Sequence, residues 1–228
     1  MKLLEFLRRS RRSRGVDMAG KADRLHGDQS IRDVVARLLT AMESLPAQSI
    51  KPKEPPFVVF LFSSLQQGQG TSTIAAAVAR ALAGCGKRTV LAVVGSPTGE
   101  SVPLGSIPLG DVVEGARPVA FDDPPLLTLH VPSHYTDLPV AARSPQAWLR
   151  GCDVMIIDAH PLTDSLTRYW VPSVHGVVLV LDGEEIAVRA VIQAREDLVA
   201  LGGNLIGVVL NRYRSRIPRF LERYFTYG

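Results

Sequence analysis

A glycine-rich stretch holds the residues with the clearest potential for chemistry. The sequence FLFSSLQQGQGTSTIAAAVARAL occupies residues 60–82, between an apolar segment and an alanine-rich one. Gly68 and Gly70 let backbone N–H groups turn toward an anion, and the hydroxyls of Ser72 and Thr73 follow at the expected start of a helix. This layout is typical of a loop that binds the phosphates of a nucleotide.

The same loop lacks the positive charge that such a site normally uses. The position before Ser72, where a phosphate-binding loop keeps a lysine, holds Thr71, and no lysine occurs between Lys53 and Lys87. A lysine there contacts the β and γ phosphates, while the following hydroxyl holds Mg²⁺. The residues therefore predict a loop that keeps the geometry without the cation. On spacing alone, an ordinary glycine turn leading into a helix is the alternative.

Apolar segments of strand length alternate with helical patterns along the chain. The expected strands are 58–62, 89–94, 126–131, 154–157, 176–181 and 205–210. The expected helices are 29–45 after an N-cap at Asp28, 72–83 ending at Gly84, a short one at 109–114, and 186–201 ending at Gly202 and Gly203. Strands that are apolar throughout and separated by helices predict an α/β fold with a parallel sheet covered by helices on both faces.

Charge divides the chain into a central domain and two basic ends. Residues 1–15 carry a net charge of +5 and residues 212–228 a net charge of +4, although the whole chain carries only +4. We expect a basic flexible arm at 1–27, an amphipathic helix and a proline-rich linker at 28–56, the domain with the loop at 57–212, and a basic, tyrosine-containing tail at 213–228. Basic ends suit an anionic partner or are simply solvated.

Several classes of protein are not supported. No apolar run reaches the roughly 18 to 20 residues of a membrane span, and the N-terminus lacks the features of a signal peptide, so a cytoplasmic protein is expected. The five histidines do not form a metal-binding pattern, because Pro132 interrupts the closest pair, His130 and His134. No GxSxG motif suggests a hydrolase.

Residues 63–94 resemble the phosphate-loop region of bacterial tyrosine autokinases of polysaccharide biosynthesis (BY-kinases), relatives of the MinD/ParA ATPases. In that family the loop reads roughly S-x-P-G-E-G-K-S-T, and a G-K-R triplet precedes a strand that ends in D-x-D. The chain keeps Gly68, Gly70, Ser72, Thr73 and the triplet Gly86-Lys87-Arg88. It replaces the family residues with Gln67, Gln69, Thr71, and, at the two acidic positions, Val93 and Gly95.

Later segments carry the same resemblance. The stretch LGDVVEG is similar to G-L-x-D-V-L-x-G, and CDVMIIDAHPLTDS is similar to Y-D-x-V-I-I-D-T-P-P, with Asp158 at the metal-side acidic position and His160 in place of a proline. Asn211 corresponds to an asparagine that lies near the adenine in relatives. The resemblance implies a P-loop NTPase-like fold with a vestigial nucleotide site formed by Gly68, Gly70, Thr71, Ser72, Thr73, Asp158 and Asn211.

The substitutions predict that the chain is not an enzyme. Catalysis of phosphoryl transfer depends on positioning and electrostatic stabilisation, and losing one charge-stabilising donor typically costs about a hundred- to a thousandfold in rate. Thr71, Val93 and Gly95 stand in place of the cation on the phosphates, the second metal-side carboxylate and the general base. Neither Arg80 nor Lys87 lies in the loop to compensate. We therefore expect no catalysis, and binding of ATP and Mg²⁺ that is lost or weak.

The resemblance also implies a role and partners. It implies a scaffold or regulator of exopolysaccharide biosynthesis and export at the inner face of the cell membrane, docked on a membrane-embedded polysaccharide co-polymerase or export component, with self-association as in the family. Residues 1–15 suit an anionic membrane surface. Tyr224 and Tyr227 are candidate phosphoacceptors, with an amphipathic tail as the alternative.

Two other functions stay open on the sequence. One is an active ATP-dependent tyrosine autokinase with an atypical loop. The other is a MinD/ParA-type positioning or partition protein, although the lysine that this group keeps near the start of the loop is replaced by Leu65 and Gln66. Nucleic-acid binding is not favoured, because few aromatic residues accompany the arginines at either end.

Overall fold

Seven parallel strands form the centre of the molecule. The computed structural model describes residues 19–44, 57–95, 107–109, 125–132, 144–145, 148, 151–184 and 188–212. The strands are β1 (Val58–Ser64), β2 (Thr89–Val94), β3 (Ile107–Pro108), β4 (Leu126–Val131), β5 (Val154–Asp158), β6 (Gly176–Asp182) and β7 (Leu205–Asn211). The helices are α2 (Ala19–Ser44), α3 (Thr71–Gly84), α5 (Ser165–Trp170), the 3-10 turn η4 (Val171–Ser173) and α6 (Val188–Ala200).

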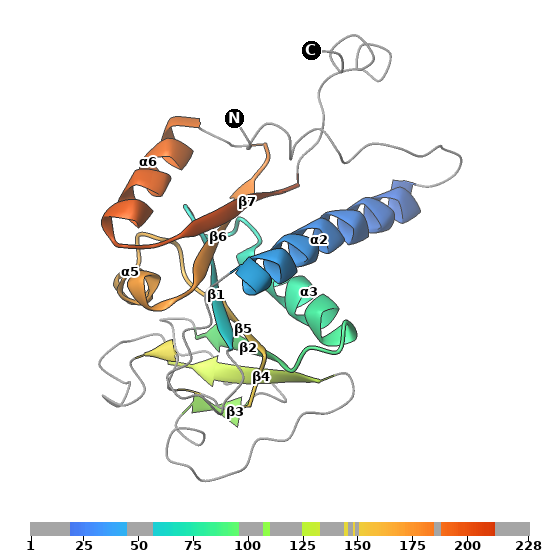
Figure 1. Ribbon diagram of the computed structural model, residues 1–228. Helices are drawn as coiled ribbons and strands as arrows, with labels where there is room; N and C mark the ends of the chain where they lie inside the picture. The colour runs from blue at the N-terminus through green and yellow to red at the C-terminus, as the bar shows by residue number, and fades with distance from the viewer. Residues whose placement is uncertain are drawn as a thin grey trace.

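The order of the strands places a topological switch point at the carboxyl edge of the sheet, and the region beyond the ends of β1 and β5 is called the crevice. The order is β3-β4-β2-β5-β1-β6-β7, and every neighbouring pair is parallel. Helices α2 and α3 cover one face, while α5 and α6 cover the other (Figure 1). The chain therefore leaves the carboxyl ends of β1 and β5 toward opposite faces, which is where α/β sheets of this kind bind ligands. The predicted α/β fold with two covered faces is confirmed.

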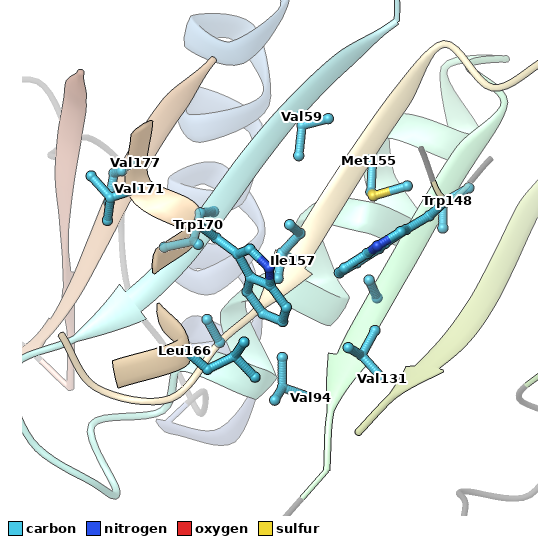
Figure 2. Packing of buried hydrophobic residues seen from close by; sticks show 14 of the residues in the cluster. Val59, Val94, Val131, Trp148, Met155, Ile157, Leu166, Trp170, Val171 and Val177 are labelled. Carbon is cyan, nitrogen blue, oxygen red and sulfur yellow. The ribbon is translucent and has the colours of Figure 1, made fainter. Parts of the chain in front are cut away.

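The central strands are buried on both sides because successive side chains point to opposite faces. On β1, Phe60 and Phe62 pack toward α2 and α3, whereas Val59 and Leu61 pack toward α5 and α6. The hydrophobic cluster on the face of α5 and α6 contains an edge-to-face pair of tryptophans, Trp148 and Trp170, whose ring centroids lie 5.3 Å apart (Figure 2). Such pairs add roughly 1 kcal/mol beyond the area that they bury.

Helix α2 starts earlier than predicted. It begins at Ala19, whereas the sequence indicated an N-cap at Asp28. The residues before Asp28 include good helix formers such as Lys21, Ala22 and Leu25, and they outweigh the roughly 1 kcal/mol that Gly27 costs relative to alanine. The predicted apolar face is confirmed in the second half of the helix, where Val34, Val35 and Leu38 are buried against α3 and the sheet.

Other differences concern short or terminal features. Helix α3 extends through Gly84, and the left-handed residue that ends it is Gly86, with Lys87 N–H donating to Leu82 O at 3.2 Å. The two-residue strand β3 and the six-residue helix α5 were not predicted. The predicted linker at 46–56 and the tail at 213–228, with Tyr224 and Tyr227, lie outside the described residues, as do residues 1–15 and, beyond Leu109, the predicted helix 109–114. None of the helices that the structure describes is both long enough and apolar enough to cross a membrane.

Candidate nucleotide site

The glycine-rich loop connects β1 to α3 at the carboxyl edge of the sheet. Gly68 and Gly70 have φ angles of 82° and 89°, in the left-handed region that favours glycine. Gly70 is also required for space, because a Cβ there would overlap the side-chain amide of Asn211. Both glycines that the sequence singled out therefore determine the shape of the turn.

The loop is held by its own buried glutamine and by the last strand. The side-chain oxygen Oε1 of Gln69 accepts hydrogen bonds from the N–H groups of Leu65 and Gln66, at 3.0 and 3.2 Å. Asn211 Nδ2 on β7 donates to the carbonyl oxygen of Gln69 at 3.0 Å. In the sequence, Gln69 stood out only as a substitution, and the resemblance suggested that Asn211 lies near an adenine. The structure shows that both residues fix the loop.

The start of α3 offers free backbone donors. Within the described part of the chain, no residue accepts a hydrogen bond from the backbone N–H groups of Gly68 through Thr73, and Gly70 supplies no side-chain cap. The first N–H groups of a helix have no partner inside it, and they lie at the positive end of its dipole. Ser72 and Thr73 are exposed beside them. The main chain thus retains an arrangement that suits a phosphate group.

Asp158 is the acidic residue of this crevice. It ends β5 between Phe62 of β1 and Val93 of β2, its register neighbours. Burial raises the pKa of its carboxyl group to about 6, and a hydrogen bond from the side chain of Ser72 and the charge of His160 oppose that rise. Asp158 and Ser72 are therefore the residues that could hold a cation, and no group of three metal-ligating side chains occurs among the described residues.

The end of β2 lacks acids and has little room for one of them. Val93 lies beside Asp158 in the sheet and packs with the core on the α3 face. A Cβ at Gly95 would lie 2.9 Å from Cε1 and 3.2 Å from Nε2 of His130, which is closer than side chains normally approach. An acidic side chain at residue 95 therefore requires His130 to move.

A second histidine, His160, lies in the corner where β2 and β5 end, next to Gly95. His160 Nε2 donates to the carbonyl oxygen of Gly95 at 2.8 Å. The carbonyl oxygen of His160 accepts hydrogen bonds from Ser63 Oγ at 2.7 Å and Thr167 Oγ1 at 3.1 Å. These contacts connect the ends of β1, β2 and β5 with α5 where the resemblance places acidic chemistry. In the sequence, His160 is recognisable as a substitution for a proline, whereas no pattern indicates that His130 lies against Gly95.

The basic residues considered as substitutes for the missing lysine lie elsewhere. Arg80 is exposed on α3, nine residues from its start, which corresponds to roughly 14 Å along a helix. Lys87 precedes β2 at the amino edge of the sheet, next to Arg88, which pairs with Asp153 at 2.7 Å. Arg212, at the carboxyl edge, pairs with Asp182 at 3.1 Å. None of these basic residues takes the place of a lysine at Thr71.

Solved structures with this fold include kinase domains and ATP-binding enzymes. The chimerical protein CapA2B2 has a TM-score of 0.59 at 23% identity, covering 81% of this chain and 84% of its own. The kinase domain of VpsO has a TM-score of 0.55 at 22% identity, covering 82% and 98%. Cobyrinic acid a,c-diamide synthase from Mycobacterium smegmatis, with an ATP analogue and magnesium bound, has a TM-score of 0.54 at 20% identity, covering 74% and 80%.

The likeness of this chain to known proteins lies in its fold. No protein-family model and no curated protein matches the chain. The three structures above are below 25% identical to this chain, so they bear on the fold alone. They show that the chain has the P-loop NTPase-like α/β fold shared by BY-kinase domains and MinD/ParA-type ATPases.

Proposed function

We propose that this protein is a catalytically degenerate relative of the bacterial tyrosine autokinases, acting as a scaffold or regulator of exopolysaccharide biosynthesis and export. The observation that best supports the proposal is the set of residues at the corner where β2 and β5 end. Val93 and Gly95 lie at the end of β2, and Asp158 lies at the end of β5. One acidic position holds a packed aliphatic side chain in register with Asp158. The other is occupied by a glycine against which His130 packs.

The electrostatics of the crevice explain why turnover is not expected. Phosphoryl transfer needs cations that neutralise the charge on the moving group, and a carboxylate set that holds the metal. Thr71, at the lysine position, is uncharged and buried at the start of α3. Among the described residues, Asp158 supplies the one buried carboxylate of the crevice, with a pKa raised by burial to about 6. The free N–H groups of the loop alone support at most weak binding of ATP.

The proposed partner is a membrane-embedded polysaccharide co-polymerase or export component, contacted from the cytoplasmic side. Sequence resemblance suggests this partner, and the fold common to this chain and the kinase domain of VpsO supports it. A fold with a rigid parallel sheet and helices on both faces can present docking surfaces without chemistry. Self-association and phosphorylation of Tyr224 or Tyr227 by an active kinase are parts of the same proposal.

A complementation experiment separates a scaffold from an enzyme. Deleting the gene in its native host is expected to lower exopolysaccharide output, and wild-type protein is expected to restore it. A scaffold is also expected to restore output when it carries Ser72→Ala, which removes the hydroxyl that would hold Mg²⁺. Equal protein levels are verified by immunoblot. Failure of Ser72→Ala at normal protein level would contradict the proposal and favour an active kinase.

A turnover assay addresses the chemistry directly. Purified protein with Mg²⁺ and radiolabelled ATP is expected to release no phosphate and to incorporate none into its own tyrosines. Ser72→Ala is the matched control, because any activity of this crevice must fall in that variant while contaminating activity does not. Phosphate transfer that disappears in Ser72→Ala would show that the atypical loop is catalytic.

The proposed membrane contact rests on the charge of the N-terminus. Residues 1–15 carry +5, and each basic residue near an anionic surface contributes about 1 kcal/mol. Co-sedimentation with vesicles containing phosphatidylserine is expected to fall strongly when these residues are deleted. Equal sedimentation of the full and shortened chains would remove this part of the proposal.

A further inference from the structure

A cavity of about 340 Å³ lies behind the glycine-rich loop, between the loop, α5, the end of β6 and α6. Leu65, Gln66 and Gln69 form its loop wall. Gly70, Thr71, Ser72, Asp158 and Asn211 do not line it. The cavity is therefore separate from the crevice where the backbone donors of α3 are free, although the two share the loop as a wall.

The cavity combines an apolar floor with a polar rim. Leucine side chains from three segments of the chain form much of the floor: Leu162, Leu181, Leu198 and Leu201. Thr163 and the amides of Gln66 and Gln193 contribute hydrogen-bonding groups. Cavities of this size, mostly apolar with a few convergent polar groups, are the usual shape of small-molecule sites.

The charges on the rim indicate the sign of the ligand. Asp182 is already paired with Arg212 at 3.1 Å, and Asp197 accepts a hydrogen bond from Gln193 at 3.0 Å. Arg168 is exposed on α5, and its side chain forms no ion pair or hydrogen bond with another residue in the described part of the chain. It is also the single basic residue among the described residues that line the cavity. The amide of Gln193 is neutral, so Asp197 keeps its charge, but Arg168 is the charged side chain of the described rim that has neither a hydrogen bond nor an ion pair. Arg168 is therefore the group on this rim that can pair with an anion.

We propose that this cavity binds a small organic anion with an apolar body, whose charged group pairs with Arg168 and whose body rests on the leucine floor. The loop wall links the site to the crevice, because Gln69 bonds Leu65 and Gln66 with its side chain and receives Asn211 on its carbonyl oxygen. A ligand that contacts Gln66 and Gln69 thereby restrains the loop. The proposal does not depend on the proposed scaffold function.

The test uses 1-anilinonaphthalene-8-sulfonate, an aromatic sulfonate, as the probe. Titration into the full chain, followed by fluorescence and by methyl NMR, is expected to show saturable binding of one molecule per chain. Shifts are expected at Leu162, Leu181, Leu198 and Leu201, and not at Leu82 on the opposite face. Unsaturable binding, or shifts centred away from the cavity, would overturn the proposal.

Two pairs of matched variants locate the contacts. Arg168→Gln is expected to weaken binding by roughly three- to tenfold, because it removes a charge-assisted contact at an exposed site. Arg195→Gln, on an exposed part of α6 outside the cavity, is expected to leave it unchanged. Ala190→Phe should obstruct the rim, whereas Ala200→Phe on the same helix should not. Indifference to both Arg168→Gln and Ala190→Phe would overturn the proposal, and circular dichroism verifies that all four variants fold.

Discussion

The two sides of the crevice differ in what each retains of a nucleotide site. On the loop side, Gly68 and Gly70 keep left-handed turns, and no described residue accepts a hydrogen bond from the first N–H groups of α3. On the β2 side, an aliphatic residue and a glycine stand where acids are expected, and two imidazoles surround the glycine. The main-chain half of the site has the geometry for phosphate, while the side-chain half lacks the charges for chemistry.

The difference teaches that binding geometry and catalytic charge have separate structural causes. The loop depends on glycine conformation and on the start of a helix, neither of which requires a charged side chain. The charges depend on individual side chains, and each can be replaced by another that fits the same space. Val93 is an example, because it packs with the core on the α3 face at a position where the family keeps an acid. A fold can therefore keep a phosphate-shaped turn after losing the means to use it.

The largest effect is expected from breaking the loop side. Gly70→Ala should lower the free energy of unfolding by about 2 to 3 kcal/mol. Roughly 1 to 2 kcal/mol comes from the left-handed backbone, and about 1 kcal/mol comes from displacing Asn211 and its hydrogen bond to Gln69. Urea denaturation of both proteins measures the difference.

Gly68→Ala is the matched control for that change. Gly68 has a similar φ angle, but a Cβ there would meet nothing within 4 Å. The control should lose only the backbone contribution, about 1 to 2 kcal/mol. If the two variants lose the same stability, Asn211 does not hold the loop in the way that the contacts indicate.

The charge that remains beside β2 is the carboxylate of Asp158 at the end of β5. Because burial raises the folded-state pKa of Asp158 from 3.8 to about 6, the unfolded state holds its proton less tightly, and the charged carboxylate destabilises the fold above pH 6. This penalty disappears as the pH falls toward 3.8. Asp158→Asn should therefore stabilise the protein at pH 7.5 by roughly 1 to 3 kcal/mol and much less at pH 4.5.

Chemical denaturation of wild type and Asp158→Asn at the two pH values checks the sign. An asparagine can still accept a hydrogen bond from Ser72, so the variant mainly removes the charge. A variant that is destabilised equally at both pH values would mean that the carboxylate is well solvated, and that the crevice is not poor in compensating charge.

Much of the fold was predictable because it depends on local pattern. The apolar runs at 58–62 and 176–181 lie within β1 and β6, which are buried on both faces, and the left-handed Gly202 ends α6 as predicted. The short elements β3 and α5 could not be predicted, because two and six residues carry too little periodicity. Helix α2 was misjudged at its start, because Asp28 resembles a cap and yet continues the helix.

The candidate site divides in the same way. Residue types alone indicated the loop and the absent lysine, and the family resemblance indicated Asp158. The contacts that define the corner join residues far apart in the chain: His160 and Gly95 are separated by 65 positions, and Asn211 and Gln69 by 142. Such pairings arise from strand order, so no local pattern could have indicated that His130 packs against Gly95 or that Asn211 holds the loop.

A smaller effect is expected at the opposite, amino edge of the sheet. There Val59 N–H donates to Nδ1 of His175 at 3.0 Å, and burial lowers the pKa of this imidazole. Because the folded-state pKa lies below the ordinary 6.5, this contribution is fully present above pH 6.5 and is lost as the pH falls through the folded-state pKa. The direction is opposite to that of Asp158.

His175→Gln measures this contribution. The variant should lose about 1 kcal/mol at pH 7.5 and less at pH 5.5, since below pH 6.5 the imidazole takes up a proton more readily in the unfolded wild type than in the folded protein. Urea denaturation of both proteins at the two pH values provides the comparison. A loss that grows toward low pH would contradict the neutral, hydrogen-bond-accepting state of His175.

The most direct test of a phosphate-shaped loop without its charge is calorimetric titration with ATP and Mg²⁺. Wild type is expected to bind with a Kd of about 1 mM or weaker, and Thr71→Lys to bind at least about tenfold more tightly, because a charge-assisted hydrogen bond is worth roughly 1.5 to 3 kcal/mol. Thr73→Lys, which adds the same charge two residues later, should gain much less. Micromolar binding by wild type, unchanged by Thr71→Lys, would contradict the account.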